Sequence, residues 1–269
     1  MKHIIGIDCA VDDANIGLAL GTFDGECLQV SEACSGKAGA ISTLKRWVVD
    51  AKDAPVLLAI DSPLGWPELL GASLVDHRAG QPLPNNPNLL FRRRTDAEIR
   101  DRIGRQSLDV GADRIARTAH RALQMLAELA VELGLREIPL AWEPSLQPGV
   151  RAIEVYPAAT LTACPEVRFE GYKQAGAVEL RGQVIEALRK YLTLSEKWDD
   201  LLRKDVDVLD AVVCLLAGAD FLQGWAKGPK EENRLVARKE GWIWCRGEDR
   251  ASEPGARSPG SRKRPAGGA

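Results

Sequence analysis

The chain has 269 residues, of which 45% are hydrophobic and 28% charged, and its formal net charge is −2. This is ample for one sizeable core, in one elaborated domain or two small ones. No stretch approaches the roughly 18 apolar residues of a membrane span, and Asp8 interrupts the amino-terminal apolar segment before a signal sequence could form. We therefore expect a soluble, cytoplasmic protein with no membrane contact. The slight negative charge gives no global attraction to nucleic acid, so such contact would need a local basic patch.

The amino-terminal region predicts a small sheet followed by a helix and a buried strand. Residues 3–9, 14–20 and 26–33 are apolar, β-branched stretches separated by turn-forming residues, which is typical of a three-strand meander. Residues 39–51 place Ile41, Leu44, Val48 and Val49 at helical spacing. The continuous apolar run at 56–60 then predicts a strand that is buried on both faces.

A long insertion is predicted at about 63–145, over the edge of the sheet. Its first part, to about residue 111, is rich in Pro, Asn, Gly and Arg, and 82–87 cannot form a regular helix or central strand. Residues 91–121 contain nine arginines, no lysine and five acids, so this segment is basic within an acidic chain. Long ordered loops of this kind often serve as lids or binding segments.

The remaining elements alternate between helix and strand. Helices are expected at about 112–133, 174–191 and 207–225, a buried strand at 150–155 and a short last strand at 241–245. The tail at 247–269, rich in Pro, Gly, Ser and Arg, is predicted to be disordered. The expected fold class is thus α/β, with a mixed sheet flanked by helices.

Four acids lie in or just beyond segments that otherwise appear buried: Asp8, Asp61, Glu154 and Asp210. Asp61 follows a central strand, at the edge of the sheet where ligands collect in α/β proteins. An ionised carboxylate out of water costs several kcal/mol unless it is paired or bound to a cation. Four such acids converging on one edge therefore predict divalent metal ions and phosphoryl-transfer chemistry.

Six short segments in a fixed order resemble a known family. They are Gly6 to Ala10, Ala59 to Pro67, Phe91 to Asp96, Glu154 to Ala159, Gly171 to Lys173 and Asp207 to Ala211. Together, over roughly residues 3–245, they resemble the domain-of-unknown-function family numbered 429, which is regarded as a family of predicted nucleases with a ribonuclease H-like fold. The resemblance implies that the sheet and helices have ribonuclease H-like topology.

The resemblance also implies a ligand set for two Mg²⁺ or Mn²⁺ ions, which hydrolyse a phosphodiester bond together. Asp8 would bridge the ions, with Asp61 and Asp210 completing the set, so that all three are expected to be catalytic. Glu154 would be a fourth ligand or the base that orients the water. Asp207 is a further metal candidate, but it could equally cap the last helix.

Substrate contacts are expected from basic residues. Arg92, Arg93 and Arg94 form a candidate phosphate clamp, since guanidinium groups match phosphate oxygens, although an arginine run is usually a solvated surface. Lys173 belongs to one of the family segments, but a surface lysine is the ordinary reading. Glu154 could instead form a structural ion pair with an arginine such as Arg151 or Arg94. Nucleic acid is the expected partner, and its type stays open, as does a small phosphorylated substrate.

Two alternatives belong to other classes. Actin-like ATPases and sugar kinases also begin with a Gly-Ile-Asp strand, so an ATP-dependent phosphotransferase is conceivable, but no second glycine-rich segment for adenosine is evident. A non-catalytic nucleic-acid-binding or scaffolding module with the same fold is the other alternative. Retention of the four acids argues against it, because clustered like charges raise one another's pKa without benefit to a binding module.

Overall fold

A five-stranded mixed sheet forms the centre of the protein in the computed structural model, which describes residues 1–84, 86–105, 107–111 and 113–246. The strand order is β3-β2-β1-β4-β5. Their bounds are β1 Lys2–Asp8, β2 Gly17–Phe23, β3 Leu28–Ser35, β4 Pro55–Asp61 and β5 Gly149–Glu154. Strands β1, β4 and β5 are parallel, and β2 is antiparallel to both its neighbours. The predicted meander and the predicted α/β class are both confirmed.

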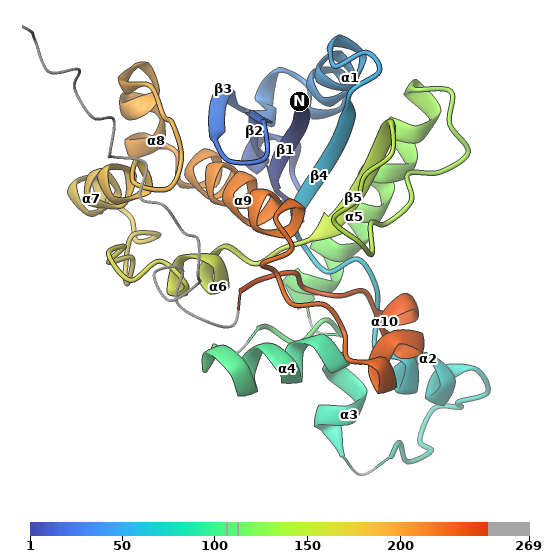
Figure 1. Cartoon of the computed structure of the whole chain (residues 1–269). Helices are drawn as coiled ribbons and strands as arrows, with labels where there is room; N and C mark the ends of the chain where they lie inside the picture. Colours follow the sequence, from blue (N-terminus) through green and yellow to red (C-terminus); the bar gives the residue numbers. More distant parts are fainter. Residues whose placement is uncertain (85, 106, 112, 247–269) are drawn as a thin grey trace, which may run out of the picture.

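Helices cover both faces of this sheet (Figure 1). On one face, α9 (Val206–Leu222) packs on Ile4, Leu57 and Ala59. On the other face, α1 (Ala40–Asp50) and α5 (Asp113–Glu132) pack against alternate strand residues, among them Ile5 and Leu58. Neighbouring strand residues point to opposite faces, so burial on both sides requires an unbroken apolar run. The run at 56–60 has this pattern and lies in β4, as predicted.

Helix α9 is itself buried almost all round, from Val208 to Leu222. Its second side is covered by a layer containing α6 (Pro157–Thr162), α7 (Val178–Leu188) and α8 (Asp199–Lys204). A helix that is apolar on every side is expected in such a position between two layers.

The predicted insertion divides into two parts. Helices α2 (Glu68–Leu74), α3 (Pro87–Phe91) and α4 (Arg94–Ile103) lie beyond the carboxyl ends of β1 and β4, in the lower part of Figure 1, together with α10 (Arg234–Glu240). Helix α5 instead returns to the sheet and supplies core residues such as Met125 and Leu129. Four single-turn 3-10 helices complete the described elements, at Asp13–Asn15, Gly36–Ala38, Glu196–Trp198 and Glu231–Asn233.

One local prediction was wrong and another holds in all but one residue. The segment 241–245 is not a strand, because it pairs with β5 only through a single bridge between Ile243 and Glu154. In α1, Leu44 is buried and Ile41 and Val48 pack against the same core, as their spacing predicted, whereas Val49 is 58% exposed and Trp47 is buried in its place. The predicted disorder of 247–269 lies outside the described residues. Within the described part of the chain, no helix combines the length and the apolar character needed to cross a membrane.

Candidate metal centre

Two of the predicted acids are brought together by strand register. Asp8 and Asp61 are the last residues of β1 and β4, and they are directly paired across these parallel neighbours. Residues paired in this way project to the same side of the sheet edge. Their adjacency therefore follows from the backbone of the sheet.

The third acid, Asp210, is delivered by the close approach of α9 to the sheet. A Cβ atom at Gly6 of β1 would lie 2.0 Å from the backbone oxygen of Ala211, and one at Gly17 of β2 would lie 1.9 Å from that of Asp207. Neither distance is possible for a real side chain, so these positions admit only glycine while α9 keeps its place. The first turns of α9 thus rest directly on strand backbone, and Asp210 reaches Asp8.

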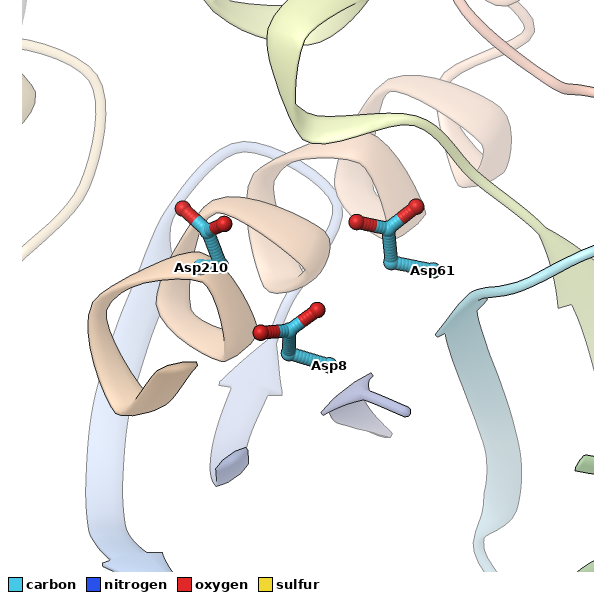
Figure 2. A group of neighbouring side chains, drawn as sticks. All are labelled: Asp8, Asp61 and Asp210. Atoms are coloured by element: carbon cyan, nitrogen blue, oxygen red, sulfur yellow. The ribbon is translucent and has the colours of Figure 1, made fainter. Parts of the chain in front are cut away.

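The three carboxyl groups converge on one small space. One oxygen atom from each of Asp8, Asp61 and Asp210 lies within 4.8 Å of the other two. Figure 2 shows the three side chains coming from three separate elements and ending close together. Asp210 is 1% exposed, whereas Asp8 and Asp61 are partly open to solvent. The site is therefore buried at the helix and accessible at the strand ends.

The partners of these carboxyls differ. Asp210 is held on both oxygens: Oδ1 accepts a hydrogen bond of 2.5 Å from the Tyr172 hydroxyl, and Oδ2 forms an ion pair with Lys173. In the described structure no donor reaches the Asp8 carboxyl, and Asp61 shares a hydrogen bond only with Asp8. Two neighbouring acids without donors either share a proton or bind a cation.

The electrostatics agree with this view. Burial, followed by the charges of Asp61 and Asp210, raises the pKa of Asp8 well above its ordinary value. Burial raises the pKa of Asp61 to about 7, although the ammonium of Lys173 opposes the shift. Burial also raises the pKa of Asp210, against the effect of Lys173. A divalent cation would relieve all three, because it favours the ionised form of each carboxyl.

Asp207 lies outside this group. It is partly buried on the first turn of α9, and burial, together with Asp205 and Asp210, raises its pKa. The capping role that the sequence left open for Asp207 belongs to Asp205, whose carboxyl accepts from the backbone N–H of Val208 at 3.2 Å.

Glu154 also lies apart from the three aspartates, and the structure favours the ion-pair alternative, with a different arginine. Arg93 donates to both oxygens of Glu154, at 2.6 and 2.7 Å, and the backbone N–H of Leu64 donates at 3.1 Å. Glu154 is 4% exposed and Arg93 is 2% exposed. The predicted roles of Glu154 as ligand or base and of Arg93 as phosphate clamp are therefore corrected, since the two side chains bind each other inside the protein.

The other two arginines of the predicted clamp are placed differently. Arg92 pairs with Asp109 at 2.8 Å, and its side chain is 24% exposed. Arg94 is exposed, and its side chain has no partner in the part of the chain that the structure describes. Helix α4 begins at Arg94, and the Glu240 carboxylate occupies its amino terminus, where it accepts from the backbone N–H of Arg94 at 2.7 Å. Of the three arginines, Arg94 is therefore the one whose guanidinium is both exposed and without a partner among the described residues.

A family model supplies the relationship of this chain to known proteins. The model described as "Protein of unknown function (DUF429)" matches residues 6–234. The chain belongs to the DUF429 family. The resemblance found in the six short segments is thereby confirmed, and no curated protein matches the sequence. The matched range contains all three aspartates of the candidate metal centre, together with Tyr172 and Lys173.

Sequence reasoning missed several residues that shape this site. Tyr172, which is 3% exposed and holds Asp210, stands next to Lys173 in a family segment but received no role. Gly6 and Gly17 could have been found, because glycines inside apolar strands often mark a close backbone approach. Glu240 carries no local signal, since its partners are backbone groups far away in the sequence.

Proposed function

We propose that this DUF429 protein is a metal-dependent phosphodiesterase, acting as a nuclease on nucleic acid. The observation that carries the proposal is the group of three aspartate carboxyls within 4.8 Å, two of which have no donor among the described residues. A protein that gained only stability from this region would be expected to provide donors for these acids or to lack them.

The fold supports the same reading. The sheet order β3-β2-β1-β4-β5, with β2 antiparallel to its neighbours, is the arrangement expected of a ribonuclease H-like fold. In that fold the acids on the first and fourth strands and on a late helix would meet at one edge, as Asp8, Asp61 and Asp210 do. The proposal for function rests on the site, because a fold alone does not determine chemistry.

The residues fit a hard divalent cation. Carboxylate oxygens are the ligands that Mg²⁺ and Mn²⁺ prefer, and Asp8 and Asp61 would hold the ion beside Asp210. When bound, such an ion polarises phosphoryl oxygens and lowers the pKa of a bound water.

The residues of the chain would then position the scissile phosphate. Hydrolysis adds a water oxygen to phosphorus, breaks one P–O ester bond and transfers a water proton to the departing oxygen. Lys173, whose side chain is 53% exposed, is close enough to the carboxyls to contact a phosphate oxygen bound among them. Arg94 on α4, together with Arg114 and Arg117 on α5, is exposed and offers further phosphate contacts along a polynucleotide.

The test is cleavage of end-labelled single-stranded, duplex, hybrid and four-way-junction DNA and RNA with Mg²⁺ or Mn²⁺. Asp8→Asn and Asp210→Asn should abolish the cutting. The control is Asp53→Asn, at an exposed acid with no hydrogen bond or ion pair among the described residues, and it should leave the cutting unchanged. In parallel, Mn²⁺ at about 100 times its Kd should stabilise the wild type by about 2.7 kcal/mol, and thus raise Tm by about 5–10 °C. Absence of both cutting and stabilisation would disprove the proposal.

A further inference from the structure

We infer that the site takes one divalent ion, held by Asp8 and Asp61, and that the ammonium of Lys173 supplies the second positive charge, beside Asp210. This inference rests on the proposed function and goes beyond it, since the sequence resemblance implies two ions. The Lys173 ammonium is a positive charge that the chain itself places among the carboxyls.

Both carboxyl oxygens of Asp210 already have partners within the protein. The Tyr172 hydroxyl donates to its Oδ1 and Lys173 pairs with its Oδ2, whereas no hydroxyl or ammonium donor contacts Asp8 among the described residues. A bridging ligand in a two-ion centre needs oxygens directed at both ions. Asp210 is positioned for a cation, and that cation is an ammonium group.

The fold fixes the position of Lys173. The preceding residue, Tyr172, is 3% exposed, and its ring packs edge-on against Phe169 at 6.4 Å. Its backbone oxygen accepts from the buried Arg181 guanidinium at 2.9 Å. Lys173 therefore leaves an anchored segment next to Asp210, which is unlike a surface lysine that meets an acid by chance.

The net charge of the site also favours a single divalent ion. Three ionised carboxylates carry −3 and Lys173 carries +1, which leaves −2 in a partly buried space. One divalent ion neutralises this remainder, whereas two would leave an excess of +2. An uncompensated charge in a site of low dielectric costs several kcal/mol.

The other candidate acids are not placed to bind a second ion. Glu154, which the resemblance offered as a ligand for a second ion, has both oxygens bound to Arg93 inside the protein. Asp207 does not belong to the group of converging carboxyls. Within the described residues, no further carboxylate completes a second coordination sphere.

The inference is tested by counting bound ions. Mn²⁺ is titrated into metal-free protein, and the unbound Mn²⁺ is measured by electron paramagnetic resonance. The wild type should bind one ion. Lys173→Met should also bind one ion, but more tightly by about tenfold or more, because the removed ammonium restores the −3 charge around the ion and frees Oδ2 of Asp210. Lys173→Arg should bind one ion with the affinity of the wild type. Lys204→Met is the matched control: Lys204 also pairs with an aspartate, Asp200, on the exposed side of helix α8, and one ion of wild-type affinity is expected.

The outcomes separate this inference from the proposed function. Two ions in the wild type, with Mn²⁺-dependent cutting intact, would overturn the single-ion inference and leave the nuclease standing. No bound ion would overturn both. One ion of unchanged affinity in a folded Lys173→Met variant, as judged by its circular dichroism melting curve, would overturn the role of Lys173.

Discussion

Two clusters of buried or partly buried acids lie close together in this protein, and they differ in how many of their carboxylate oxygens have a hydrogen-bond donor. In the first cluster, Asp8, Asp61 and Asp210 share one half-exposed lysine and one tyrosine hydroxyl. In the second cluster, every carboxylate oxygen has a donor. That second cluster comprises Glu154, Asp96 and Glu240, with Arg93 at its centre.

The second cluster joins elements that are far apart in sequence. Arg93 binds Glu154 on β5 and Asp96 on α4, and its Nη1 also donates to the backbone oxygen of Glu240 at 3.2 Å. The carboxylate of Glu240 accepts from the backbone N–H of Glu68, at the start of α2, and from that of Arg94, at the start of α4. These bonds fix the insertion to the sheet edge. Burial of an acid is thus no sign of function by itself, and the absence of donors is the informative difference.

The largest stability change that would test this contrast is expected from Arg93→Ala. The substitution leaves Glu154 and Asp96 buried without their counter-charge, which should lower the free energy of unfolding by about 3–5 kcal/mol. Urea unfolding measures the effect. Arg92→Ala is the control, since its more exposed pair with Asp109 should contribute less than about 1 kcal/mol. If Arg93→Ala left the free energy of unfolding unchanged but abolished activity, Arg93 would instead be a substrate-binding residue.

The first cluster should make the metal-free protein less stable as the pH rises. The folded pKa of Asp61 is raised from 3.8 to about 7, so the folded state binds this proton more tightly than the unfolded chain. Its contribution to stability is therefore present below about pH 4 and is lost as the pH rises to about 7, by on the order of a few kcal/mol.

The measurement is urea unfolding in EDTA at about pH 4.5 and about pH 7.5. The pH-dependent loss of the wild type should be smaller in Asp61→Asn, which has no proton to release there. Mn²⁺ should remove or reverse the trend, because a cation stabilises the ionised carboxyls. The same pH dependence in wild type and Asp61→Asn would contradict the assignment.

A smaller effect is expected from Gly6→Ala, which tests how the first cluster is assembled. The new methyl group would meet the backbone oxygen of Ala211, so α9 must move away from β1. We expect a loss of about 1–3 kcal/mol in the free energy of unfolding, as for other overpacked positions. Mn²⁺ binding should also weaken, because β1, which carries Asp8, and α9 no longer hold the three carboxyls together. Calorimetry on the variant measures both quantities. Undiminished Mn²⁺ affinity would show that the close contact between α9 and β1 is not needed for the ion.

The smallest effect is expected from Gly71→Ala in α2, in the part of the protein that the second cluster holds in place. No atom lies within 4 Å of the position where a Cβ would be added, and Gly71 is exposed. Alanine should therefore stabilise the helix by about 0.5–1 kcal/mol. Thermal melting detects this gain, and Mn²⁺ binding should stay as it is. A loss of ion binding would link α2 to the metal centre and weaken the separation of the two clusters.

The sequence alone determined the parts that depend on local pattern. Alternation and unbroken apolar runs predicted β1 to β5, because burial on one or two faces dictates which residues a strand can carry. The placement of Asp8 and Asp61 at strand ends, and of Asp210 on a buried helix, followed from the same patterns. The family segments added the order of these elements.

Only the tertiary structure decided which buried acids belong together. Glu154 and Asp210 were both acids in apolar surroundings, and nothing in their neighbours along the chain distinguished them. Arg93 reaches Glu154 across 61 residues, and Tyr172 reaches Asp210 across 38. Hydrogen-bond donors come from wherever the fold brings the chain, so a sequence shows the cost of burying a carboxylate but not the group that offsets it.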